Sequence, residues 1–246
     1  MTNKTPNWTG KAGEIRALLT RLCLPKGKEA LFNPLPLTGR NGRLSVAAQS
    51  SGVTSYLVAD VPVSGITSDF TTSVDVMELL RFLNGYGADT EVAITFGDPI
   101  SITGGGRSCT IHPEAESVAP AQTPSFNADG RIVFKSGPAT TVINTTSESL
   151  GSIISDAKTV DVPDFPLYAR ADGLHVSLGG LEAKKNRIER LVAVTVEGSD
   201  ARTVIGEDFA TVVGSVKGPV QLQLRENHPL AVVTENIRYV LLPRAV

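Results

Sequence analysis

An internal duplication constrains the fold of this chain more than any other feature of its sequence. Four segments place apolar residues at the i, i+3, i+4, i+7 spacing of an amphipathic helix, and their first apolar residues are Ile15, Val76, Leu150 and Phe209. The first and third of these residues are 135 positions apart, and the second and fourth are 133 positions apart. The Asp98–Pro99 and His228–Pro229 turns are 130 positions apart. Landmarks that recur at nearly one offset indicate two copies of one structural unit.

Strands are expected between the helices, where residues alternate between apolar and polar or run β-branched. The expected strands are Arg43–Gln49, Ser55–Val61, Glu91–Phe96, Pro99–Thr103, Arg107–Ile111, Arg131–Lys135, Leu167–Ala171, Leu174–Leu178, Arg190–Val196, Val220–Leu224, Leu230–Thr234 and Arg238–Leu242. Pro113–Gly130 is rich in Pro, Ala, Ser and Glu and lacks periodicity, which is typical of an exposed linker. The sequence therefore predicts an α+β protein with domains at 1–112 and 131–246 and a linker at 113–130. Each domain is expected to carry two helices on one face of an antiparallel sheet.

Composition excludes several classes of protein. The 246 residues are 41% hydrophobic and 20% charged, and no apolar run approaches the roughly 20 residues of a membrane span. Cys23 and Cys109 offer neither a disulfide framework nor paired zinc ligands, so we expect a reducing, cytoplasmic location and no metal or cofactor. The net charge of −2 gives no general attraction to nucleic acid, although a local basic face is compatible with it.

Two segments of the chain resemble the DNA sliding clamps. Asp69–Ile111 is similar to the clamp segment in which a helix precedes a pair of strands joined by a short turn. Gly206–Val246 is similar to the end of a clamp chain, with a helix, the strand GPVQLQL, a second strand that begins Pro-Leu, and a last strand that runs into a Leu-Pro tail. The resemblance implies two sliding-clamp-like domains per chain. Phage, archaeal and eukaryotic clamps of this kind form trimeric rings, so it also implies a homotrimer.

A clamp that encircles duplex DNA needs Lys and Arg on the helices that line its hole, because phosphate contacts hold the duplex there. The first helix and its flanks supply the DNA-facing candidates, which are Lys11, Arg16, Arg21, Lys26 and Lys28. The other helices do not, and over all four helices six basic residues stand against seven acidic ones. This balance departs from the clamp family and leaves a solvated helix face as an equal alternative.

In clamps, partner peptides place a short hydrophobic motif in a pocket between the interdomain linker and the C-terminal tail. The matching positions here are Leu241, Leu242, Pro243, Arg244 and Val246 in the tail and Val118, Pro120 and Pro124 in the linker. An apolar tail beside an extended linker is also a place where an incoming strand can add. The alternative is that Val240–Leu242 is an ordinary core strand that Pro243 ends.

Two other features have open interpretations. The basic cluster Lys184, Lys185, Arg187 and Arg190 can contact phosphate or an acidic partner, or it can be a solvated loop. Trp8, the only tryptophan, can anchor a partner or fold back on the first domain.

Motifs of catalysis are missing from the sequence. It contains no H-E-x-x-H, G-x-S-x-G or Walker motif, and His112, His175 and His228 are far apart. Gly104–Gly106 lies between two expected strands, which favours a hairpin over a phosphate-binding loop. We therefore expect no catalytic residues and no metal site, and a protein that is not an enzyme.

These observations predict a clamp-fold accessory factor in DNA transactions that acts through protein contacts. The simplest form is a polymerase processivity factor whose partners are a DNA polymerase and duplex DNA. The chain as a whole also resembles the recombination directionality factors that actinophages supply to their serine integrases. In this alternative it binds a serine integrase and switches its att-site choice between integration and excision. Either role is expected in the cytoplasm of a bacterial host if the chain is phage-encoded, with no membrane partner.

Overall fold

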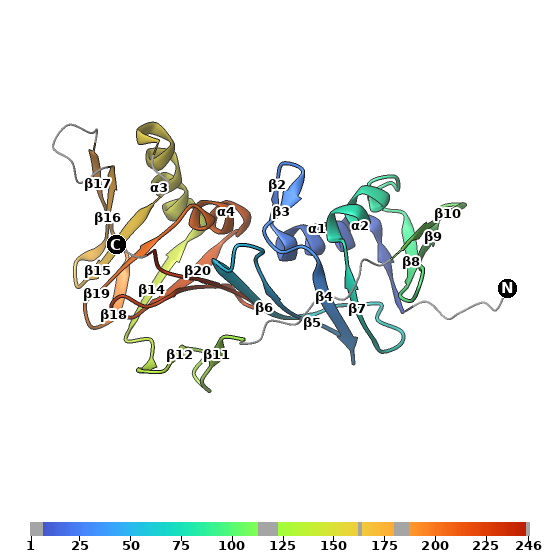
Figure 1. Cartoon of the computed structure of the whole chain (residues 1–246), viewed down its shortest axis with the longest axis horizontal. Coiled ribbons are helices and arrows are strands. Elements are labelled where there is room, and N and C mark those ends of the chain that lie inside the picture. The colour runs from blue at the N-terminus through green and yellow to red at the C-terminus, as the bar shows by residue number, and fades with distance from the viewer. Residues whose placement is uncertain (1–6, 113–122, 162–163, 180–186, 245–246) are drawn as a thin grey trace. The chain divides into compact units, whose positions relative to one another are not determined.

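A computed structural model describes residues 7–112, 123–161, 164–179 and 187–244, and the chain divides into two compact units (Figure 1). Unit 1 comprises Met1–Val53 and Leu57–Thr123, and unit 2 comprises Thr54–Tyr56 and Pro124–Val246. Each unit contains two helices and antiparallel strands, so the predicted α+β architecture is confirmed. The residue bounds of the two predicted domains stay a prediction.

Unit 1 begins with a strand and a helix and ends with a three-stranded run. Its elements are β1 (Trp8–Lys11), α1 (Ala12–Cys23), β2 (Pro25–Lys26), β3 (Glu29–Ala30), β4 (Leu35–Arg40), β5 (Arg43–Gln49), β6 (Ser55–Pro62), β7 (Phe70–Val74), α2 (Val76–Leu83), β8 (Glu91–Thr95), β9 (Ile100–Gly104) and β10 (Arg107–Ile111). One sheet has the strand order β1-β8-β9-β10 and the other β6-β5-β4-β7.

Unit 2 repeats this order after a small three-stranded sheet. Its elements are β11 (Ser125–Phe126), β12 (Ile132–Phe134), β13 (Gly137–Pro138), β14 (Thr141–Thr146), α3 (Ser147–Val160), β15 (Phe165–Arg170), β16 (Gly173–Gly179), β17 (Arg187–Val192), β18 (Thr195–Gly198), β19 (Ala201–Ile205), α4 (Asp208–Ser215), β20 (Pro219–Leu224), β21 (Leu230–Val233) and β22 (Ile237–Leu241). Its strands form the series β18-β14-β20-β21-β22 and the sheet β17-β16-β15-β19.

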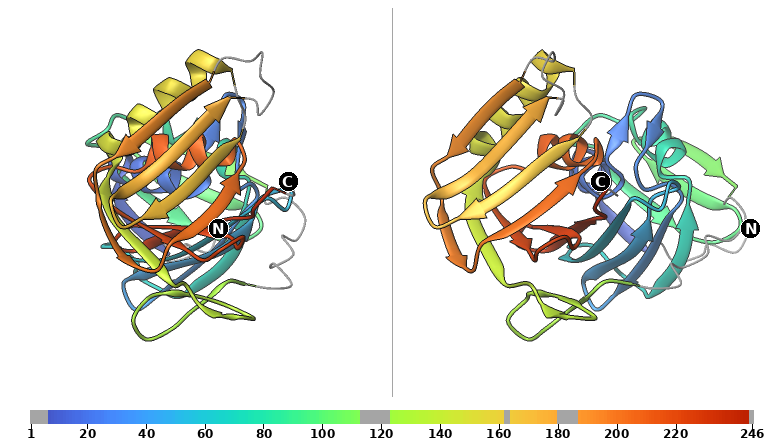
Figure 2. Two further views of the ribbon diagram at one scale, coloured as in Figure 1. Left: turned by 90° about the vertical axis from the view of Figure 1, so that its left-hand side faces the viewer. Right: turned by 60° about the vertical axis from the view of Figure 1, so that its left-hand side comes forward.

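The helices of each unit pack against each other and cover one face of its sheets (Figures 1 and 2). Their apolar stripes are buried, as the predicted spacing requires: Ile15, Leu19 and Leu22 in α1 are at most 2% exposed. Polar side chains cap two of the helices. Asp75 caps α2 by accepting a hydrogen bond from the Glu78 amide at 3.0 Å, and Thr146 caps α3 by accepting one from the Ser149 amide at 3.3 Å.

The duplication extends to residue identity, which the offset of the helices alone does not reveal. The strand LPLTGR at 35–40 and the strand FPLYAR at 165–170 lie 130 positions apart and share three residues in register. In both copies the next strand follows through a tight turn and buries a leucine, Leu44 or Leu174. The two units are therefore copies of one fold, and matched positions in them can be compared directly.

Burial settles one open interpretation, and strand pairing refines the predicted linker. Trp8 is 1% exposed on β1, so it belongs to the core of unit 1 and is not an exposed anchor. The predicted linker Pro113–Gly130 is structured at its end, because Ser125 and Phe126 pair with Val133 and Ile132. Residues 113–122 lie outside the described residues, as do Lys184 and Lys185 of the basic cluster.

Candidate interaction surfaces

The small sheet β11–β13 packs on one face of the β20–β22 strands through a buried polar side chain. Gln223 is 1% exposed; its Oε1 accepts a hydrogen bond from the Ile132 amide at 2.8 Å, and its Nε2 donates to the Gly130 carbonyl at 3.0 Å. The Asn127 carboxamide accepts from the Arg131 amide at 2.8 Å and closes the turn that joins β11 to β12. These bonds set where the aromatic side chains of the small sheet lie.

Half-buried apolar side chains gather around this junction. They pack on buried Ile132, Ala139, Ala231 and Val240, and we call them the apolar patch: Tyr56, Phe126, Phe134 and Val233. The Arg238 guanidinium lies 4.6 Å from the centre of the Phe126 ring, a cation–π contact. Partly exposed aromatic rings ringed by polar groups are typical of protein-binding surfaces.

Sequence reasoning missed the aromatic members of this patch. Phe126 falls inside the predicted linker and Phe134 in a predicted strand whose buried face was not assigned. The available signal was the presence of two phenylalanines in a stretch otherwise rich in small and polar residues.

The C-terminal tail leaves β22 and runs along β19. Leu241 is fully buried and pairs with Leu230, so up to this residue the tail is a core strand. Pro243 bridges to Ile205, and the Arg244 amide donates to the Val204 carbonyl at 2.9 Å. The Arg244 guanidinium also forms an ion pair with Asp164, with Nε and Oδ1 3.5 Å apart.

These contacts refine the predicted partner pocket. Leu241 is a core residue and cannot line an open pocket, and the Arg244 amide is already bonded, so it cannot pair with an added strand there. Leu242 and Pro124 are half-buried. Leu242 is two residues along the chain from Val240, one of the buried residues on which the apolar patch packs, and Pro124 is two residues from Phe126 of the patch. Val118, Pro120 and Val246 lie outside the described residues.

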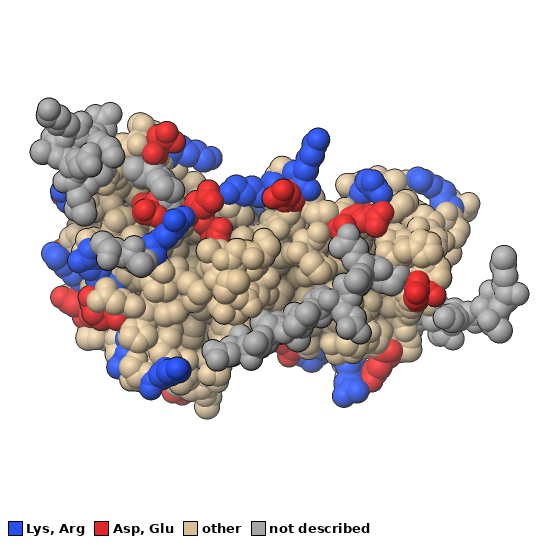
Figure 3. Space-filling model, viewed as in Figure 1, with Lys and Arg blue, Asp and Glu red and all other residues tan. Residues whose placement is uncertain are grey.

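The basic residues of the first helix are partly used within unit 1. The Arg16 guanidinium donates to the Leu83 and Tyr86 carbonyls, each at 3.4 Å, and to the Asn84 carboxamide at 3.3 Å, which satisfies acceptors at the end of α2. Lys11 forms an ion pair with Asp89 at 3.2 Å. Arg21, Lys26 and Lys28 are exposed, the last two around the β2–β3 hairpin. On the face shown in Figure 3, basic and acidic side chains are interspersed and form no continuous basic band.

Titratable groups show no arrangement for catalysis within the described ranges. They contain no group of three or more His, Cys, Asp or Glu side chains that could hold a metal ion. Cys23 is fully buried, and burial raises the pKa of its thiol to about 12, so it is a core residue and not a nucleophile. The Gly104–Gly106 stretch is the predicted hairpin, because β9 and β10 pair directly through it. None of the described helices is long and apolar enough to cross a membrane.

Comparison with known proteins identifies the fold. No protein-family model matches the sequence, and no curated protein matches it. The structure is similar to the Proliferating Cellular Nuclear Antigen of Entamoeba histolytica, with a TM-score of 0.75 at 10% identity over 98% of this chain and 100% of that chain. It is similar to A. fulgidus PCNA, which was solved with the C-terminal region of FEN-1 bound, with a TM-score of 0.75 at 13% identity over 97% and 98% of the two chains.

The DNA polymerase III beta chain of Streptococcus pneumoniae is also similar, with a TM-score of 0.79 at 12% identity, and this chain spans 66% of its length. The class defined by these likenesses is the sliding-clamp fold in its two-domain form. The predicted fold is confirmed over the whole chain.

Proposed function

We propose that this protein is a clamp-fold accessory factor of DNA transactions that acts through protein contacts and catalyses no reaction. The observation that carries this proposal is the match to two-domain clamps over nearly the full length of both chains. In its simplest form the protein holds a DNA polymerase on duplex DNA. If the chain is phage-encoded, it works in the cytoplasm of the bacterial host.

The apolar patch supports a role in partner binding. One solved clamp binds the C-terminal region of FEN-1. In this chain the side chains available to a hydrophobic peptide motif are Phe126, Phe134 and Tyr56 of the apolar patch, flanked by Leu242 and Pro124. We propose that a polymerase peptide binds there, and not along the whole predicted tail.

Paired substitutions test the patch. Phe126→Ser should abolish binding of the replicative DNA polymerase from the same genome, measured by surface plasmon resonance. Val133→Ser is the matched control, because Val133 is exposed on the neighbouring strand β12 and is not part of the patch. A truncation should begin at Arg244 and not at Leu241, because Leu241 is a core residue. Equal binding by the Phe126→Ser and Val133→Ser proteins would reject the patch.

A ring requires open sheet edges, and each unit offers a candidate edge strand. β10 ends the β1-β8-β9-β10 order in unit 1, and β17 ends the β17-β16-β15-β19 order in unit 2. Unpaired edge strands of this kind can add to another chain, and pairing β10 of one copy with β17 of the next is a head-to-tail contact that can close a ring. We propose that a homotrimer forms through these two edges.

Proline substitution on β10 tests the homotrimer. Gly105 and Gly106 both have positive φ, 52° and 75°, which is typical of the two-residue hairpin in which Arg107 and Gly104 form a hydrogen-bonded pair. Alternation then directs the Thr110 amide away from β9, so Thr110→Pro should remove an outward donor and leave the β9 ladder intact. Light scattering should give three chains for the parent and Thr110→Ala proteins and one for Thr110→Pro. A parent protein that is monomeric at micromolar concentration would reject the ring.

The charges on the helices favour a second function. Among the predicted DNA-facing residues, the Arg16 side chain is bonded to the end of α2 and the Lys11 side chain to Asp89, so both are already engaged within unit 1. A clamp-like adaptor that binds a serine integrase and switches its att-site choice needs no basic helix face. This second candidate is supported if the protein stays monomeric and changes the products of a serine integrase in an in vitro recombination assay. Stimulation of primer extension on a circular template supports the first candidate.

A further inference from the structure

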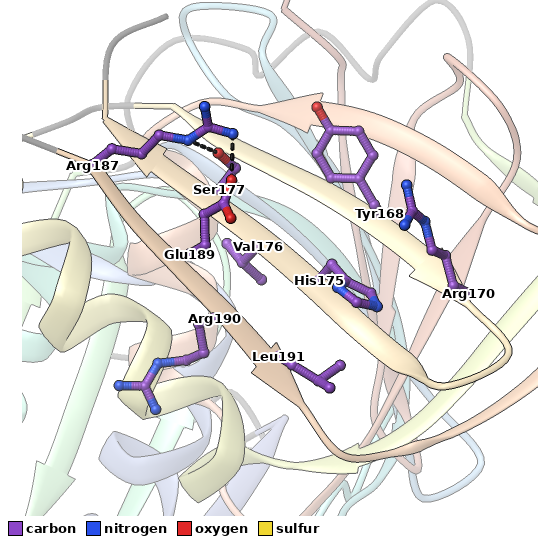
Figure 4. Close-up of a pocket in the computed structure, with 9 residues that line it drawn as sticks. All are labelled: Tyr168, Arg170, His175, Val176, Ser177, Arg187, Glu189, Arg190 and Leu191. Atoms are coloured by element: carbon purple, nitrogen blue, oxygen red, sulfur yellow. Dashed lines mark hydrogen bonds and ion pairs between the residues drawn. The ribbon is translucent and has the colours of Figure 1, made fainter. Parts of the chain in front are cut away.

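A row of side chains crosses the sheet β17-β16-β15-β19 of unit 2 on the face away from α3. In the strand register, Arg202 pairs with Tyr168, Tyr168 with His175, and His175 with Leu191. Figure 4 shows Tyr168, His175 and Leu191 on one face of these strands with Arg170 beyond them, while Arg190 points toward α3 and forms an ion pair with Asp156. The row borders a shallow hollow of about 420 Å³.

The arginines at one end of the row are available to a ligand. The Arg202 guanidinium lies 5.0 Å from the centre of the Tyr168 ring, and this stacking orients the group while leaving its N–H donors free. Among the residues that the structure describes, neither Arg202 nor Arg170 has a side-chain ion pair within 4.0 Å. The opposite end of the row is apolar, because Leu191 is 51% exposed.

The carboxylates on this face are already occupied. Asp172 bonds His175 at 2.8 Å, and this hydrogen bond lowers the pKa of the Asp172 carboxyl, which keeps it ionised. Glu189 forms an ion pair with Arg187, and that arginine also donates to Ser177. The Asp172 carboxylate also feels the charge of Arg170, and Glu226 accepts a hydrogen bond from the Arg202 backbone amide at 2.7 Å, but among the described residues neither guanidinium forms an ion pair.

Unit 1 shows that the fold does not require this row. In the matched register of β4, β5 and β7, the positions of Arg202, Tyr168 and His175 are held by three small polar residues: Thr71, Thr38 and Ser45. The arginines there are neutralised, with Arg40 bonded to Asp69 at 2.9 Å and Arg43 to Asp60 at 2.8 Å. One copy of the fold thus presents a neutral, short-chain surface, whereas the other presents free cations, an aromatic ring and an exposed leucine.

We propose that this row is a docking surface for an acidic segment of a partner protein that carries an apolar side chain beside its carboxylates. Arg202 and Arg170 would bind the carboxylates in forked geometry, and Leu191 would pack against the apolar side chain. Neighbouring strands are about 4.8 Å apart, so the row spans about 14 Å, the length of roughly four extended residues. A single-stranded nucleic acid fits less well, because one face of the Tyr168 ring is already covered by Arg202 and is closed to a base.

Peptide binding to the full chain tests this surface. The probe is a fluorescein-labelled heptapeptide with two glutamates, three glycines and two leucines, measured by fluorescence anisotropy at 50 mM and 300 mM NaCl. We expect binding at low salt that weakens at high salt. The double variant Arg170→Glu, Arg202→Glu should bind the peptide at least about tenfold more weakly than the parent.

Matched controls separate this surface from general charge effects. Arg40→Glu with Thr71→Glu places the same two glutamates at the equivalent positions of unit 1 and should leave affinity within about twofold of the parent. Leu191→Ser should also weaken the peptide, while a lysine version of the peptide should not bind. Thermal melts check that every variant is folded.

Three results would overturn the proposal. They are absence of peptide binding by the parent, equal losses in the unit 1 and unit 2 variants, and tighter binding of a 15-nucleotide oligo-dT than of the peptide. The proposal does not depend on the ring. Leu191 lies on β17, the proposed ring edge, but Tyr168, Arg170, His175 and Arg202 lie on β15, β16 and β19, and none of them belongs to the apolar patch.

Discussion

Gln223 is the residue whose replacement tests most directly how the apolar patch is built. Its carboxamide is buried and joins β20 to the small sheet through the Ile132 amide and the Gly130 carbonyl. Gln223→Leu keeps a side chain of similar size and removes both bonds to the small sheet, together with the Nε2 donation to the Gln221 carboxamide at 2.6 Å. We expect the small sheet to lose its anchor while the rest of unit 2 stays folded.

The size of the effect follows from these two contacts. An unpaired buried amide or carbonyl costs about 1–3 kcal/mol, so losing both partners costs about 4 kcal/mol. The apolar leucine side chain offsets about 1.5 kcal/mol by burial. The net loss is about 2.5 kcal/mol, which corresponds to a roughly 70-fold loss of protection at the Ile132 amide if the opening is local.

Hydrogen exchange, measured by mass spectrometry on peptides that cover 123–139, gives the free energy of local opening of the small sheet. Guanidinium denaturation gives the free energy of global unfolding. Gln49→Leu is the control, because Gln49 is a half-buried glutamine on β5 of unit 1, outside the small sheet, and should cost less than about 1 kcal/mol. Unchanged exchange of 123–139 in the Gln223→Leu protein would refute the reasoning. It would mean that hydrophobic contacts alone hold the small sheet.

Three other substitutions have expected outcomes. Gly39→Ala places a Cβ 2.1 Å from the Phe70 ring, so we expect a loss of about 1–3 kcal/mol in urea denaturation, and no loss would show that the ring moves freely. Gly151→Ala lies in α3 with open space around it and should gain about 0.5–1 kcal/mol in the same assay, whereas a loss would contradict the helix assignment. The Cys23 thiol, with its pKa raised to about 12, stays protonated in the native state while the unfolded thiol ionises above about pH 9. The thiol's contribution to the free energy of unfolding is therefore complete below pH 9 and declines as the pH rises toward 12. Between pH 8 and pH 10.5, the free energy of unfolding measured by denaturation should fall more for the parent than for Cys23→Ala. Equal falls in the two proteins would contradict this.

Helices were the part of the fold that could be read from the sequence. All four stripes fall within helices or at their ends, because burial of one face imposes the helical period on the residues themselves. Several strands were missed, among them Leu35–Arg40, Phe70–Val74 and Thr141–Thr146. Gly39 and Pro36 interrupt the first of these, and the other two are rich in threonine, so their alternation is weak.

The proposed partner site was less predictable, since its residues come from separate strands. The prediction placed it on the tail and the linker, whereas Leu241 is a core residue and Phe126, which was assigned to the linker, pairs with Ile132 in the small sheet. The basic cluster was read as one unit in the sequence. In the structure Arg190 points to α3, whereas Arg187 lies on the opposite face of β17.

The sequence by itself determined the class of fold, because helical stripes and X-Pro turns that recur at one offset describe two copies of one α+β unit. It also determined that the helices carry no excess of basic charge. Only the tertiary structure decided which side chains share a surface. Strand register placed Arg202, Tyr168, His175 and Leu191 in one row, although they come from four different strands and are far apart in the sequence. Pairing between strands depends on the packing of the whole sheet, and no local stretch of residues specifies it.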